Sequence, residues 1–192
     1  MESIRKDHII DDYIIDIKKI DVEQDLQSMT WPFCLSTELW KKYNEHTHSV
    51  DLHSLRKIKY FGNDESELSE QVSGLPEDIG GIYLYVIENS VIPIAGSYIM
   101  YVGRARKTNS ENLKKRAKSH FYQYRRHEEN ERLERVFDKW NQHLYFLYLP
   151  VNESDDIIDL IEDELILALT PPCNKDYPSP KIRRKLSAFN YS

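Results

Sequence analysis

The stretch from Gly80 to Phe121, GGIYLYVIENSVIPIAGSYIMYVGRARKTNSENLKKRAKSHF, decides the fold. Residues 81–88 and 97–102 are rich in β-branched and aromatic side chains and are bounded by glycines, which predicts two strands of an antiparallel hairpin. The residues between the two runs end in Gly96 and predict a loop instead of a two-residue turn. After Gly103 the sequence becomes basic, and apolar residues recur at helical spacing, which predicts a helix.

The segments after this stretch predict further helices and a third strand. Residues 128–140 carry apolar side chains at helical spacing, so they form either a second helix or the continuation of the first after a kink. Residues 143–150 form an apolar run that ends in a proline, which predicts the third strand. Ser154 can cap a helix that runs to about Leu169, because Pro171 disfavours helical geometry in the residue before it. The sequence therefore predicts an α+β fold, with a small mixed β-sheet of a hairpin plus a third strand, flanked by helices.

Composition and punctuation divide the chain into three parts. With 192 residues, 40% hydrophobic and 30% charged, the composition is that of an ordinary globular protein. Gly74 and Pro76 follow an acidic segment, so we expect an N-terminal region at 1–76, a main domain at 77–178 and a basic tail at 179–192. The N-terminal region would serve recognition or dimerisation. Whether residues 1–30 form strand or helix stays open, because both patterns fit in part.

The sequence contains no sign of a membrane segment or of export. No run approaches the roughly 18 apolar residues of a membrane helix, and the first residues lack the apolar core of a signal peptide. Cys34 and Cys173 are too few for a disulfide framework or a cysteine zinc site. We therefore expect a cytoplasmic protein with no membrane partner.

The charges are distributed unevenly along the chain. The formal net charge is −6, and residues 1–76 account for it with 15 acidic and 9 basic side chains. Residues 101–126 hold nine basic side chains against Glu111 alone. Since salt confines exposed charges to about 8 Å, this local charge of +8 matters more for binding than the total. Such a run is ordinarily a solvated helix face, but its attachment to the hairpin favours a nucleic-acid partner.

Glu162 is a candidate functional carboxylate because of its place in the last predicted helix. The buried stripe of that helix is expected to contain Ile158, Ile161, Leu165 and Leu169, with Glu162 at its margin. Asp163 and Glu164 are expected to point outward. A carboxylate against an apolar face costs several kcal/mol unless it is paired or bound to a cation. Spacing alone leaves two alternatives open, a metal ligand or a salt bridge to a core arginine such as Arg116.

Short motifs in this order resemble those of the GIY-YIG nuclease family. The triplet 81–83 (GIY) is similar to the first signature, and 101–103 (YVG) to the second, with valine for the middle isoleucine. Arg116 and His120, four residues apart on one side of a helix, match the arginine and histidine of several members. Glu162, followed further on by Asn174, is similar to the closing pattern. The resemblance covers roughly residues 77–176.

The resemblance implies a hydrolytic site and a role for each of its members. Tyr83 would be the general base for water, Tyr101 would position water or phosphate, and Arg116 would stabilise the transition state. His120 would donate to a phosphate oxygen or assist proton transfer, although a solvated helix histidine is the ordinary alternative. Glu162 would bind the cofactor, Mg²⁺ or Mn²⁺. Asn174 would hold the active-site loop through side-chain-to-backbone hydrogen bonds.

The resemblance also implies a substrate, which is DNA. The side chains that we expect to contact the DNA backbone without reading sequence are Arg104, Arg106, Lys107, Lys114, Lys115 and Lys118. The function predicted is a metal-dependent DNA endonuclease of restriction type, for which a homodimer is the economical way to cut both strands. The alternatives are a repair or structure-specific nicking nuclease, a toxin-like or RNA-directed nuclease, and a binding module that does not cut.

Overall fold

The fold is described from a computed structural model of the chain, in which residues 33, 35–64, 67–92 and 95–180 are placed well enough to describe. All of these residues belong to one compact unit. The predictions made for residues 1–30 and for most of the basic tail lie outside the described residues. Among the described helices, none is long and apolar enough to span a membrane.

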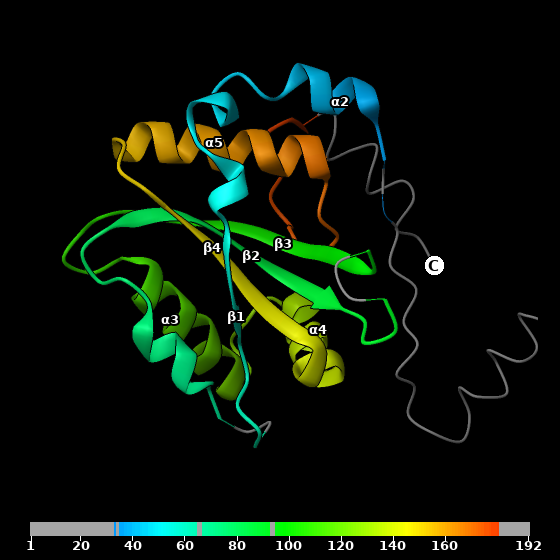
Figure 1. The fold of residues 1–192 in the computed structure, drawn as a ribbon, viewed down its shortest axis with the longest axis vertical. Helices are drawn as coiled ribbons and strands as arrows, with labels where there is room; N and C mark the ends of the chain where they lie inside the picture. Colours follow the sequence, from blue (N-terminus) through cyan, green and yellow to red (C-terminus); the bar gives the residue numbers. More distant parts are fainter. Residues whose placement is uncertain (1–32, 34, 65–66, 93–94, 181–192) are drawn as a thin grey trace, which may run out of the picture. The chain divides into compact units, whose positions relative to one another are not determined.

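A four-stranded sheet forms the centre of the fold (Figure 1). Its strands are β1 (Arg56–Lys59), β2 (Gly80–Glu88), β3 (Ser97–Ala105) and β4 (Leu144–Val151), in the spatial order β1-β4-β2-β3. The predicted hairpin, third strand and α+β class are confirmed. Every strand pair is antiparallel, so the sheet is not of the mixed kind, and β4 continues one residue past Pro150.

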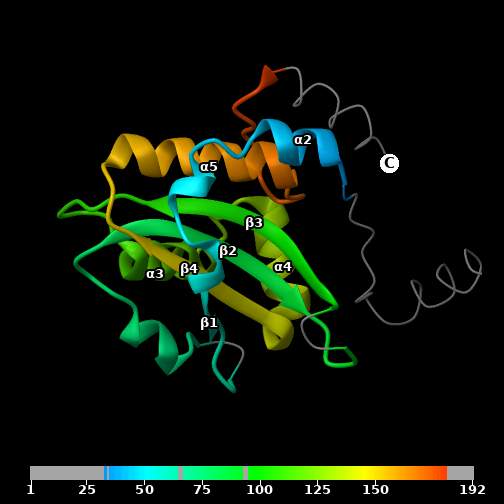
Figure 2. The same cartoon turned by 45° about the horizontal axis from the view of Figure 1, so that its top comes forward.

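Helices cover both faces of the sheet (Figures 1 and 2). The α-helices are α2 (Thr37–Lys42), α3 (Leu113–Arg125), α4 (Glu131–Trp140) and α5 (Asp155–Leu169), and the 3₁₀ turns are η1 (Thr47–Ser49), η2 (Leu52–Ser54), η3 (Glu70–Gly74) and η4 (Asn141–His143). Helix α5 lies on one face beside α2, and α3 and α4 lie on the other. The Ser154 side chain caps α5 as predicted, by accepting a hydrogen bond from the Ile157 backbone.

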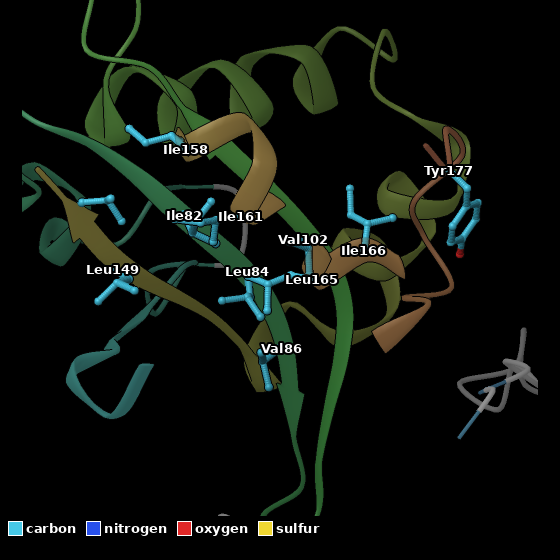
Figure 3. Close-up of a cluster of buried hydrophobic side chains, with 11 residues drawn as sticks. Ile82, Leu84, Val86, Val102, Leu149, Ile158, Ile161, Leu165, Ile166 and Tyr177 are labelled. Atoms are coloured by element: carbon cyan, nitrogen blue, oxygen red, sulfur yellow. The ribbon is translucent and has the colours of Figure 1, made fainter. Parts of the chain in front are cut away.

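Alternation along β2 separates two different cores. Ile82, Leu84 and Val86 face α5 and pack against its buried stripe (Figure 3). Tyr83 and Tyr85 point to the opposite face, because successive strand residues alternate in direction. Both residues are fully buried there in an aromatic cluster under α3 and α4. Since both faces are covered, β2 is buried from Gly80 to Ile87 instead of alternating between buried and exposed residues.

The boundary that we predicted after residue 76 falls inside this compact unit. Strand β1 precedes that boundary, yet it pairs with β4, with Ile58 opposite Phe146. Tyr60 is fully buried, and its ring packs 4.9 Å from that of Tyr85 and 5.3 Å from that of Phe137. The described residues before position 76 therefore contribute to the same sheet and core as those after it.

Glu164 is buried on α5, which corrects the prediction that it points outward. Its two carboxylate oxygens accept hydrogen bonds from the backbone N–H of His46 and of Thr47, each at 2.9 Å. Nδ1 of His46 lies 2.8 Å from the same carboxylate. These donors come from more than 110 residues earlier in the chain, so helical periodicity alone could not reveal them.

Candidate functional site

The hydroxyl group of Tyr83 lies at the centre of the candidate site. It is 2.8 Å from Nε2 of His120, and Nη2 of Arg116 donates a hydrogen bond to it at 3.3 Å. The ring of Tyr101 stacks near that of Tyr83, with 6.2 Å between centroids, and lies 5.7 Å from the His120 ring. Four of the six predicted catalytic side chains are therefore in contact.

The start of α3 fixes the two helical members of this cluster. Asn112 caps the helix, because its Oδ1 accepts a hydrogen bond from the Lys115 backbone at 2.8 Å. Its Nδ2 donates to the Glu77 carbonyl at 2.9 Å, which ties the helix to the segment that enters β2. Arg116 and His120 then follow at a spacing of four residues, so both side chains reach the sheet on the same side.

Gly103 leaves the space that the two tyrosine rings occupy. A Cβ atom at this position would lie 2.5 Å from both Cζ and Oη of Tyr83 and 2.8 Å from Cε1 of Tyr101. Gly103 is opposite Tyr83 in the hairpin register, and β3 is an edge strand of the sheet. The absence of a side chain therefore lets Tyr83 lie across β3 towards the edge of the sheet.

His120 is buried, so the alternative of a solvated helix histidine does not apply. Its Nδ1 lies 2.6 Å from Oε2 of Glu129, and the two side chains are 5% and 6% exposed. Sequence reasoning missed Glu129. It stands in the connection between α3 and α4, among other charged residues, where no periodicity distinguishes a buried side chain from exposed ones.

Glu162 lies at the margin of the α5 stripe, as predicted, with 17% of its side chain exposed. Its direct partner is Arg104 of β3, whose Nε lies 2.9 Å from Oε2 of Glu162, and not Arg116. The same nitrogen lies 2.5 Å from Oδ1 of Asp159. Nε of Arg104 has no well-directed hydrogen bond within the described part of the chain, so one charge is shared between two carboxylates.

Burial raises the pKa of Glu162 to about 7. Arg104 and, more weakly, Arg116 oppose this rise, while Asp163 and Asp159 add to it. The effect of burial on the pKa outweighs that of Arg104, because Arg104 is shared between Glu162 and Asp159. A carboxyl in this state gains from the approach of a further positive charge.

Electrostatic interactions connect Glu162 to the tyrosine cluster. Burial raises the pKa of Tyr101 to about 12, and the Glu162 charge contributes to that rise. Burial also raises the pKa of Tyr83 well above its ordinary value, with Arg116 opposing and Glu162 contributing. The neighbouring Tyr83 raises the pKa of Arg116. Glu162 thus acts on this cluster through its charge, whereas its contact is with Arg104.

Asn174 supports the backbone of β3 next to Tyr101. Its Oδ1 accepts a hydrogen bond from the Val102 backbone N–H at 3.0 Å, and its Nδ2 donates to the Val102 carbonyl at 2.8 Å. The preceding residue, Cys173, donates from its backbone to the Met100 carbonyl at 2.9 Å. The loop after α5 is therefore held against the strand that carries the second tyrosine of the cluster.

Several of the predicted DNA-binding side chains have partners within the chain. Arg104 and Arg106 contact Asp159, and Lys114 contacts Glu77 at 2.5 Å. Nζ of Lys115 donates to the Asn109 carbonyl at 2.5 Å. Lys107 and Lys115 are exposed, and Lys118 is half-buried. Arg104 at the end of β3 and Arg106 just after it therefore link the hairpin to α5, which the sequence did not indicate. A DNA contact by any of the six side chains stays a prediction.

The candidate site could bind a divalent cation only through a single protein ligand, with water and phosphate oxygens as the other ligands. Within the described ranges, no group of three or more His, Cys, Asp or Glu side chains is arranged to hold a metal ion. Mg²⁺, however, commonly binds through one or two carboxylates and completes its octahedron with water and phosphate oxygens. Glu162, a partly exposed carboxylate whose pKa is about 7, fits such a site as its protein ligand.

Comparisons with known proteins return no relative. No protein-family model, no curated protein and no solved structure matches this chain. The geometry of the site is therefore the basis for any functional conclusion.

Proposed function

We propose that this chain is a metal-dependent DNA endonuclease with a GIY-YIG-like catalytic domain, of restriction type, in which each active site hydrolyses one strand. The supporting observation is the Tyr83 hydroxyl, which lies 2.8 Å from His120 and 3.3 Å from Arg116. The charge of Glu162 acts on the same hydroxyl. A proton acceptor, a cationic donor and a carboxylate for a cation are what phosphodiester hydrolysis requires.

In this proposal Tyr83 accepts a proton from the attacking water. Burial raises its pKa well above the ordinary value, so the phenol is protonated in the resting site. Tyr83 must therefore lose its own proton before it can act as a base. Nε2 of His120, 2.8 Å away, is within hydrogen-bond reach and takes that proton. Tyr101, stacked beside Tyr83, positions the water or the phosphate.

Arg116 stabilises the negative charge that develops on the phosphoryl oxygens. Its Nη2 is engaged by Tyr83, while its Nε has no hydrogen-bond partner in the described segments and is 3.8 Å from Glu111. A planar guanidinium with donors still available suits a phosphate. Because the same group contacts Tyr83, it would also hold the phosphate near the base.

Glu162 would hold Mg²⁺ or Mn²⁺ through its carboxylate. The bound cation would supply charge for the phosphoryl oxygens and lower the pKa of water. Arg104 would shift its charge towards Asp159, the carboxylate it already contacts at 2.5 Å. Cleavage of both strands needs two such sites, which a two-fold dimer on the DNA would provide.

A nucleic-acid-binding module that does not cut is the second candidate. The contact between Arg104 and Glu162 favours it, because the arginine already occupies the carboxylate that a cation would need. Such a module would use the exposed lysines, Lys107 and Lys115, for the backbone of the nucleic acid without any hydrolysis.

Nicking of supercoiled plasmid separates the two candidates. The purified chain, incubated with plasmid and Mg²⁺, is expected to nick, and both a chelator and the Glu162→Ala change are expected to abolish nicking. A panel of duplex, branched and single-stranded DNA and of RNA defines the substrate class. If the wild-type chain cuts none of these substrates with Mg²⁺ or Mn²⁺, the nuclease proposal fails and the binding module is favoured. Full activity of Glu162→Ala would remove the metal assignment.

A further inference from the structure

Glu129 is a buried carboxylate that the proposed mechanism has not yet used. Its Oε2 lies 2.6 Å from Nδ1 of His120, and its Oε1 accepts a hydrogen bond from the backbone N–H of Asn130 at 2.8 Å. Both oxygens are therefore held, and the side chain is 6% exposed. A buried carboxylate is costly unless its charge is compensated, so its position next to His120 calls for an explanation.

A second histidine–carboxylate pair in the same region provides a contrast. Nδ1 of His127 lies 2.6 Å from Oε1 of Glu134, the same distance as in the buried pair. The His127 side chain is 83% exposed, so its hydrogen bond with Glu134 is a surface contact. The pair of Glu129 and His120 is buried instead, and the second ring nitrogen of His120, Nε2, faces the Tyr83 hydroxyl.

The direction of each hydrogen bond follows from the groups involved. An ionised carboxylate can only accept, so Nδ1 of His120 carries a proton that it donates to Glu129. When the ring is neutral, Nε2 is then unprotonated and can accept the proton of the Tyr83 hydroxyl. Arg116 can only donate, so the Tyr83 oxygen accepts from it, and the hydroxyl proton remains available to His120.

We propose that Glu129 is the positioning residue that fixes His120 in the tautomer able to accept the Tyr83 proton. In the step that follows, the O–H bond of Tyr83 breaks and an N–H bond forms at Nε2. The phenol becomes a phenolate and the ring becomes an imidazolium, so net charge is conserved. The Glu129 carboxylate faces the positive charge on the ring, and Arg116 faces the negative charge on the phenolate. The catalytic part of this inference rests on the proposed nuclease function, whereas the tautomer does not.

Imidazole ¹⁵N spectroscopy tests the tautomer without any substrate. In the ¹⁵N-labelled chain at pH 8, where an ordinary histidine is neutral, Nδ1 of His120 is expected to resonate as a protonated nitrogen and Nε2 as an unprotonated one. His120→Gln assigns the signals. Glu129→Gln is expected to change them, because an amide can also donate to Nδ1, whereas the control Glu134→Gln is expected to leave them unchanged. A wild-type His120 that carries its proton on Nε2 would overturn the proposal.

Plasmid nicking tests whether the tautomer matters for catalysis. Glu129→Gln is expected to lose on the order of 10²-fold or more in rate, the range typical of lost proton transfer or of a wrong tautomer. Glu129→Asp, which restores the charge, is expected to recover part of the rate, and Glu134→Gln to keep all of it. Because Glu129 acts through His120, adding Glu129→Gln to His120→Ala should cause no further loss.

Three results in this activity series would contradict the positioning role. They are a wild-type rate in Glu129→Gln, equal losses in the Gln and Asp variants, and a double variant that loses the product of the two separate factors. Circular dichroism serves as the control that each variant is folded. If the wild-type chain cuts no nucleic acid, the nuclease proposal fails, and the ¹⁵N spectrum alone decides whether Glu129 fixes the ring.

Discussion

Gly103 and Tyr83 lie opposite one another in the hairpin, and the tyrosine ring fills the space that a side chain at Gly103 would occupy. Gly103 is the last residue of the second signature-like triplet, and Tyr83 is the last residue of the first. The hairpin register therefore brings the last residues of the two triplets together. A larger residue at position 103 would collide with the ring of Tyr83, the proposed general base.

Gly103→Ala should therefore disturb the site more than an ordinary surface change. A Cβ atom 2.5 Å from Oη and Cζ of Tyr83 must move the ring, and overpacking of this kind typically costs about 1–3 kcal/mol. Urea unfolding measures the cost, and nicking should fall with it. Gly74→Ala is the matched control, because nothing lies within 4 Å of a Cβ there. Equal stability of the two variants would contradict the packing of Tyr83 over Gly103.

Tyr83→Phe removes the hydroxyl and leaves the ring in place. His120 and Arg116 each lose a hydrogen-bond partner, so we expect nicking to fall on the order of 10²–10⁴-fold with little change in fold. Tyr98→Phe on the same hairpin is the control, because Tyr98 is 48% exposed and belongs to no cluster of the site. Nicking by Tyr83→Phe at the wild-type rate would exclude Tyr83 as the base.

Glu162→Gln should stabilise the protein at high pH while it abolishes nicking. The pKa of Glu162 rises from an ordinary 4.5 to about 7 on folding. Between these values the folded carboxyl retains a proton that the unfolded one has released, so stability falls as pH rises from 4.5 to about 7. The full cost, up to about 3 kcal/mol, is present above pH 7, and a neutral glutamine avoids it.

Urea unfolding at pH 5 and pH 8 measures this effect. The gain from Glu162→Gln is expected at pH 8 and should be small at pH 5, with the loss of one Arg104 partner reducing it at both. Glu153→Gln removes a charge at an exposed position and should show no such pH dependence. A Glu162→Gln variant that is less stable than wild type at pH 8 would show that Arg104 outweighs burial.

Glu164→Gln should act in the opposite direction. Burial by itself raises the pKa of Glu164, but hydrogen bonds from His46 and Thr47 together outweigh it and leave the pKa below its ordinary value. The stabilisation is therefore present above pH 4.5 and is lost as pH falls through the folded value. Hydrogen bonds to a charged group contribute about 1.5–3 kcal/mol each, so the change should cost about 2 kcal/mol or more at pH 7.

Thermal unfolding at pH 7 and pH 3 checks the contribution of Glu164. Glu131→Gln, at an exposed position in the first turn of α4, is the control. An unchanged melting temperature of Glu164→Gln at pH 7 would mean that the contact with His46 and Thr47 contributes nothing to the docking of that segment.

The sequence predicted most of the elements that local patterns determine. The hairpin was found from its runs of β-branched and aromatic residues bounded by glycines, and α3 and α5 were found from apolar residues at helical spacing; short windows show both signals. Strand β1 was missed because its four residues, Arg56–Lys59, carry three basic side chains and no turn links them to their partner β4. For the same reason, the sequence did not show that the described residues before position 76 share a sheet with those after it.

In the candidate site, too, some contacts could be predicted from the sequence and others could not. The contact of Tyr83 with Arg116 and His120 was expected, because the resemblance implies one site for all three, and a helical spacing of four puts Arg116 and His120 on one side of α3. Glu129 and Glu164 were not found, because their side-chain partners, His120 and His46, lie in other elements. The pairing of Glu162 with Arg104 depends on how α5 crosses β3, which no sequence window contains.

The most direct test of the nuclease account is the location of the metal. A crystal of the chain with a DNA oligonucleotide, soaked in Mn²⁺, would give anomalous density at the ion. We expect a peak at the Glu162 carboxylate, with a phosphate oxygen of the DNA on the same ion and Arg116 on that phosphate. A peak on other side chains, or DNA bound with Glu162 still held by Arg104 and no ion beside it, would contradict the account.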